Sequence, residues 1–100
     1  MIHTSKPLFN LGQVVATPGA LDALGKAGQS PSEFLDRHVR GDWGNLCAED
    51  SEENTLSLKD GSRILSVYHT KSEDKIWIIT EAADEHGQRA ATTLLLPSEY

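Results

Sequence analysis

Three closely spaced apolar segments in the C-terminal part of the chain, at 63–70, 75–82 and 89–96, constrain the fold more than any other feature. They combine β-branched and aromatic residues with alternation of apolar and polar positions, which is typical of strands. Polar segments at 71–74 and 84–87 separate them, and Pro97 follows the third. Because short connections join antiparallel neighbours, the pattern predicts one antiparallel sheet with these strands in sequence order.

Helix signals precede the strands. Thr17-Pro18 and Ser30-Pro31 each place a capping residue before a proline, which suits the first helical position because its missing N–H costs nothing there. Glu33 follows Ser30 by three residues, as in a capping box. A third helix is predicted from about 48 to 59, with acids in its first turns, where the helix dipole favours them, and only a thin apolar face.

The segment 8–16 is either a short strand or a loop that carries Gly12. Helices followed by a meander predict an α+β fold, with two to three short N-terminal helices packed on one face of a three- to four-stranded antiparallel sheet. One hundred residues are enough for one core, so we expect a single domain over 8–100 behind a flexible arm at 1–7.

Charge and composition exclude several classes of protein. Nine Lys and Arg are spread along the chain against fifteen Asp and Glu, giving a net charge of -6, which argues against general nucleic-acid binding and suits a basic protein partner. No apolar run approaches the ~20 residues of a membrane span, and no secretory signal is visible, so we expect a cytoplasmic protein that does not bind membranes. The single cysteine, Cys47, excludes an intrachain disulfide, and we expect a half-buried thiol.

The segment 36–44 concentrates side chains that hydrogen-bond, titrate and stack. His38 and Asp42 could form a general base and its orienting carboxylate. The alternative, which the pattern favours, is a histidine on an inner helix face that makes structural hydrogen bonds. Arg37 and Arg40 could bind an anion or pair with nearby acids. Trp43 is either a plug in the core, the favoured reading, or a binding anchor.

Further candidates lie outside this segment. Glu81 would lie near Trp77 on one strand face, where it could act as an acid with a raised pKa or pair with Arg63 or Arg89. The acidic residues of the third helix could contact a basic partner; they are Glu49, Asp50, Glu52 and Glu53. The histidines and Cys47 show no ligand spacing for a metal, and no cofactor motif is present.

Four segments resemble a family of small bacterial proteins associated with plasmids and mobile elements, some of them labelled restriction-modification accessory proteins. The matching segments run from Phe9 to Leu21, from Arg37 to Gly44, from Ile76 to Glu81 and from Thr92 to Tyr100. The resemblance spans nearly the whole chain after residue 8 and departs at 84–88, where the family has a shorter turn. It supplies no catalytic residues.

Two hypotheses about function follow. The first is a non-enzymatic interaction protein of a mobile element, an accessory or inhibitory factor that counters host restriction or CRISPR defence. The second is a small enzyme or ligand-binding protein that uses His38, Asp42, Arg37 or Arg40, and Glu81. Convergence of His38, Asp42 and Glu81 in one pocket would favour the second hypothesis.

Overall fold

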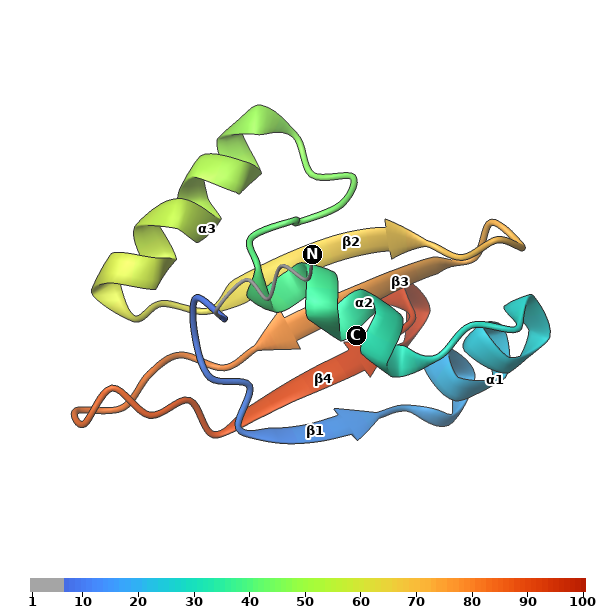
Figure 1. The fold of residues 1–100 in the computed structure, drawn as a ribbon, viewed down its shortest axis with the longest axis horizontal. Coiled ribbons are helices and arrows are strands. Elements are labelled where there is room, and N and C mark those ends of the chain that lie inside the picture. Colours follow the sequence, from blue (N-terminus) through green and yellow to red (C-terminus); the bar gives the residue numbers. More distant parts are fainter. Residues whose placement is uncertain (1–6) are drawn as a thin grey trace, which may run out of the picture.

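The computed structural model describes residues 7–100, so the flexible arm predicted for residues 1–7 lies outside the described residues except for Pro7. The α+β class is confirmed (Figure 1). The elements are β1 (Gln13–Ala16), α1 (Pro18–Ala27), α2 (Pro31–Val39), α3 (Ala48–Asp60), β2 (Ile64–His69), β3 (Lys75–Thr80), β4 (Ala91–Leu95) and the 3-10 turn η1 (Pro97–Glu99). The segment 8–16 therefore contains a short strand, preceded by an irregular stretch.

The four strands form one sheet in the order β1-β4-β3-β2. The pairings of β2 with β3 and of β3 with β4 are antiparallel, as predicted. The expectation of a wholly antiparallel sheet is wrong, because β1 is parallel to β4. Between β1 and β4 the chain crosses one sheet face through α1 and α2, and such a crossover is the connection that parallel strands require.

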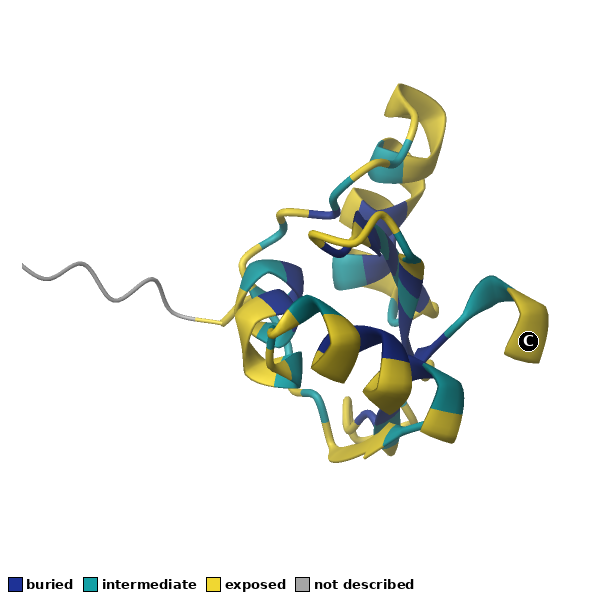
Figure 2. Ribbon diagram, turned by 90° about the vertical axis from the view of Figure 1, so that its right-hand side faces the viewer, coloured by how far each residue is buried: buried dark blue, intermediate teal, exposed yellow. Residues whose placement is uncertain are grey.

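Helices α1 and α2 cover one face of the sheet, and the core lies between them and the strands (Figure 2). Leu24 of α1 and Phe34 of α2 are fully buried with Tyr68, Ile78 and Leu94 of the sheet. The prediction that the helices cover one face holds for these two. Helix α3 instead lies along the outer edge of β2 (Figure 1).

Local signals explain the limits of α1 but only partly those of α2. The Thr17 hydroxyl accepts a hydrogen bond from Ala20 N at 3.1 Å, and Gly28 ends α1 in the left-handed conformation at φ 67°. The capping box predicted for α2 is wrong, because Ser30 makes no side-chain cap bond. Glu33 instead accepts a hydrogen bond from the Gln29 side chain at 2.6 Å.

The outer edge of β2 is occupied by two other segments. Asn54 of α3 uses its side-chain amide like a neighbouring strand, because it donates to Leu65 O at 2.6 Å and accepts from Leu65 N at 3.1 Å. Further along, Gly44 forms a parallel bridge with Val67. An exposed edge is a template for unwanted pairing, and these contacts close this one.

Helix α3 turns polar rather than apolar side chains toward the rest of the protein: its two buried residues are Asn54 and Ser57. This agrees with the thin apolar face seen in the sequence. Cys47, just before the helix, is exposed rather than half-buried as expected. It stands at the N-cap, where the chain leaves the β2 edge, and so lies outside the packed part of the helix.

Candidate functional site

His38 lies at the centre of a buried hydrogen-bond chain. Its Nδ1 is 2.5 Å from Ser66 Oγ, and its Nε2 is 2.8 Å from Thr80 Oγ1. Thr80 Oγ1 is 2.7 Å from Thr92 Oγ1, which donates to the carbonyl of Leu11 at 2.8 Å. The chain links α2, three strands of the sheet and the segment before β1.

The direction of each proton in this chain follows from its last bond. The Leu11 carbonyl can only accept, so the single hydroxyl proton of Thr92 is donated to it. Thr80 must therefore donate to Thr92, and His38 Nε2 must donate to Thr80. A neutral imidazole then accepts at Nδ1 from the Ser66 hydroxyl. His38 is accordingly the neutral Nε2–H tautomer, with both ring nitrogens engaged.

The surroundings of His38 keep it neutral. Its side chain is fully buried, and the rings of Phe9 and Trp43 pack against it with centroids 5.1 and 6.0 Å away. Burial lowers the pKa of His38 to about 3, and the nearby positive charge of Arg89 acts in the same direction. A general base must reach its substrate, whereas this imidazole is enclosed and uses both nitrogens internally.

Asp42 pairs with Arg37 rather than with His38. Arg37 Nε donates to Asp42 Oδ2 at 2.7 Å, and the guanidinium lies over the Tyr68 ring at 4.6 Å. The hydrogen bond from Arg37 holds the pKa of Asp42 below its ordinary value, and the same bond raises the pKa of Arg37. The Tyr68 hydroxyl donates to the Asp42 carbonyl at 2.5 Å, which fixes the turn after α2.

The other candidates from the sequence, Arg40, Glu81 and Trp43, differ in their exposure and contacts. Arg40 is exposed at the end of α2. Glu81 is exposed directly after β3, and its backbone carbonyl, not its carboxylate, accepts from Arg89 at 3.0 Å. Trp43 is 8% exposed, so the prediction that it is buried is confirmed. His38, Asp42 and Glu81 are therefore not gathered in one pocket.

Arg89 is buried, which nothing in the sequence indicated. It donates to the carbonyls of Ser57, Ser62 and Glu81 at 3.0, 2.8 and 3.0 Å, and it lies over the Phe9 ring. Ser57 is near the C-terminal end of α3, where the helix dipole favours a positive charge. Arg89 thus holds α3 to the sheet, through carbonyls whose positions no local motif encodes.

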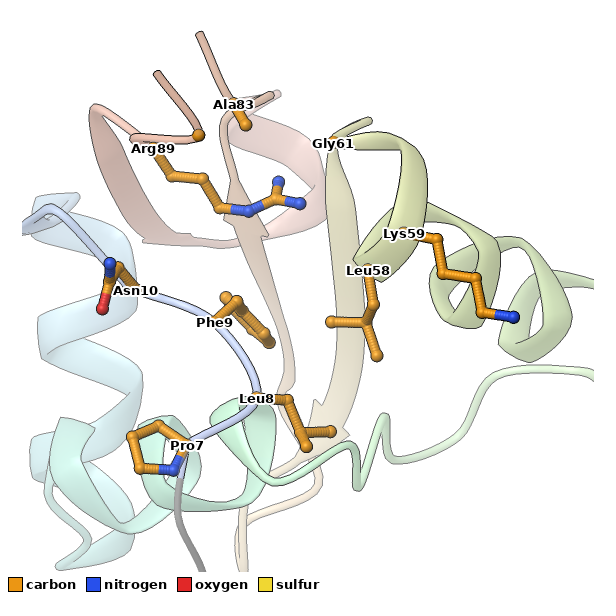
Figure 3. A pocket seen from close by; sticks show the side chains of 10 residues that line it. Pro7, Leu8, Phe9, Asn10, Leu58, Lys59, Gly61, Ala83 and Arg89 are labelled. Carbon is orange, nitrogen blue, oxygen red and sulfur yellow. The ribbon is translucent and has the colours of Figure 1, made fainter. Parts of the chain in front are cut away.

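A cleft of about 390 Å³ opens between the segment 7–10 and the end of α3 (Figure 3). Leu8, Phe9 and Leu58 line it, and Lys59 and Arg89 contribute its charged side chains. Arg89 is already engaged with backbone carbonyls, so Asn10 and Lys59 are the polar side chains of this cleft that could orient a ligand. Among residues 7–100, no cluster of three or more His, Cys, Asp or Glu could hold a metal ion.

The sheet face opposite α1 and α2, here called the open face, carries an apolar surface. Its side chains alternate with the core residues along β2, β3 and β4; they are Leu65, Val67, Trp77, Ile79, Thr93 and Leu95. Leu65, Val67 and Trp77 are half-buried, whereas Ile79 and Leu95 are buried, each with 6% of its surface exposed. The C-terminal turn lies on this side (Figure 2). There the ring centroids of Tyr100 and Trp77 are 5.6 Å apart, and Arg63 lies over the Tyr100 ring.

Three carboxylates of α3, here called the acidic wall, border the open face; they are Glu49, Asp50 and Glu53. Glu49, Asp50 and Glu53 of α3 line a hollow of about 300 Å³ together with Leu65 and Arg63 of the sheet side. All four acidic candidates of α3 are exposed, but Glu52 does not line the hollow. Apolar contact area and a row of negative charge thus lie side by side.

Comparison with family models, with curated proteins and with solved structures found no match to this chain. No helix among residues 7–100 is long and apolar enough to cross a membrane.

Proposed function

We propose that this protein is a non-enzymatic binding protein whose working surface is the open face together with the acidic wall. The observation that carries the proposal is the half-buried apolar row of Leu65, Val67 and Trp77 on the open face, which α1 and α2 leave uncovered. Contiguous apolar side chains that stay partly accessible beside polar residues can form an interaction site. Trp77, Arg63 and Tyr100 on this face belong to the residue types that dominate binding energy in interfaces.

The partner that fits this surface is a basic protein. Apolar side chains of the partner would pack on Leu65, Val67 and Trp77, and its Lys or Arg side chains would meet the carboxylates of α3. Opposite charges across an interface speed association and select partners. The net charge of -6 favours the same kind of partner.

The internal use of the candidate catalytic groups supports a binding role over the enzyme hypothesis. His38 is enclosed and neutral, and Asp42 is engaged by Arg37. Both make contacts that stabilise the turn and the core. A catalytic role would require an accessible acid or base beside a substrate cavity.

We further propose a cytoplasmic accessory or inhibitory factor of a mobile element, acting on a host protein of restriction or CRISPR defence. The sequence resemblance to mobile-element proteins motivates this context. Proteins that act on DNA or RNA carry basic surfaces for the phosphate backbone, and an acidic protein can occupy such a surface.

The test begins with capture of a host protein on the immobilised wild type, followed by rate measurements with that purified protein. Trp77→Ala should speed dissociation, and Glu53→Lys should slow association at low salt. Glu52→Lys is the matched control, because it makes the same charge change one residue away from the hollow. Equal rates for all variants, with amide spectra that confirm their folds, would contradict the proposal.

A further inference from the structure

The free edge of β1 differs from the edge of β2 at the other side of the sheet. β1 borders the sheet in Figure 1, with no described segment beyond it. Gln13 N and Thr17 N donate to Ala90 O and Leu94 O of the β4 side. Because peptide groups alternate in direction along a parallel strand, those of Val14 and Ala16 point away from the sheet.

Natural sheets close their edges with charges, prolines, bulges or covering segments. The β2 edge is covered by Asn54 and by the bridge at Gly44. β1, with the sequence Gln-Val-Val-Ala, has no charged residue or proline, and Val14 and Val15 are 43% and 41% exposed. Its outward N–H and C=O groups are arranged to pair with another strand.

The charge around β1 identifies the strand that fits. No charged residue occurs from Pro7 to Leu21 in a chain whose net charge is -6, and the Glu99 carboxylate that contacts this segment is engaged by the Thr17 hydroxyl and Gly19 N, just beyond the end of β1. The strand itself offers no carboxylate to a basic partner. A second copy of this acidic chain, by contrast, can approach this edge without setting charged side chains of the two β1 strands against each other.

We propose that two copies of this protein pair through β1, antiparallel and about a two-fold axis at Val15. Val14 of each copy then lies opposite Ala16 of the other, and their outward peptide groups form four hydrogen bonds. Val15 lies opposite Val15 of the partner. The two sheets become one continuous sheet, and each copy keeps its open face. The surface is small, so the dimer is weak and depends on concentration. It is independent of the proposed function.

Sedimentation velocity of the full chain over a range of concentrations tests this. The expected result is a rise from the behaviour of one 10.9 kDa chain toward that of two. Added salt should strengthen the dimer because it screens repulsion between two acidic molecules, whereas it should weaken binding to a basic partner. The two proposals can therefore fail separately.

Paired charge variants test the register. Val15→Lys and Val15→Glu should each stay monomeric where the wild type dimerises, since like charges directly opposite are unfavourable. An equimolar mixture should recover a heterodimer. Val14→Pro, which removes an outward N–H, should also abolish the dimer, and Val14→Thr, which keeps it, should not. A wild type that stays monomeric at every concentration, or a mixture that does not dimerise, would overturn the proposal.

Discussion

At the residue scale, His38 makes the stability of the fold depend on pH. Its pKa is about 3 in the folded protein and near the ordinary value of 6.5 in the unfolded chain. Below pH 6.5 the unfolded chain therefore takes up a proton that the folded protein refuses. The contribution of neutral His38 to the free energy of unfolding is fully present above pH 6.5. It is lost as the pH falls toward 3, by at most about 1.4 kcal/mol per pH unit.

Chemical denaturation across this pH window, in the wild type and in His38→Gln, measures the effect. Acidic groups such as Asp42 titrate in both proteins, so the difference in slope isolates the imidazole. The wild type should lose stability more steeply than the variant between pH 6.5 and 3. Parallel curves would mean that His38 accepts a proton in the folded state.

The two tryptophans provide a second test at this scale. Trp43 is 8% exposed between Phe9 and His38, so Trp43→Ala should cost about 3–5 kcal/mol, as a large-to-small change in a core. Trp77→Ala is the control, because Trp77 is half-buried on the open face and should cost clearly less. Urea denaturation midpoints decide. Equal costs for the two changes would show that Trp43 packs no more tightly than Trp77.

At the scale of elements, Asn54 should account for much of the attachment of α3. Asn54→Ala leaves the N–H and the carbonyl of Leu65 without their partner, so we expect a loss of roughly 1–3 kcal/mol. The Leu65 amide should exchange its hydrogen faster, as measured by NMR. Asn45→Ala is the matched control, because Asn45 meets the same edge through its backbone N–H alone. Unchanged exchange at Leu65 would contradict the role given to Asn54.

The same scale shows what the sequence could predict. Thr17-Pro18 and Gly28 mark α1 because a cap acts on its immediate neighbours. The capping box at Ser30 fails because Gln29, equally close, engages Glu33 instead. The parallel pairing of β1, the carbonyls around Arg89 and the partners of His38 join residues far apart in the sequence, and no local pattern specifies them.

At the scale of the whole molecule, stability should be uneven. β3 is central, with Ile76, Ile78 and Thr80 fully buried, whereas α3 is held by polar contacts of Asn54, Ser57 and Arg89. Segments with few buried apolar contacts open first. Native-state hydrogen exchange should therefore be slowest in β3 and faster throughout α3. Equal protection in the two elements would show that α3 unfolds only with the sheet.

The parallel pairing of β1 with β4 also has a consequence for biosynthesis. β1 leaves the ribosome long before β4, and at about 5–20 residues per second roughly 4–15 s pass before its partner strand exists. During that interval both sides of the Gln-Val-Val-Ala strand are bare, not only the outer one. The nascent chain thus carries an unpaired valine segment until β4 is made, and during that interval the segment can pair with strands of other chains.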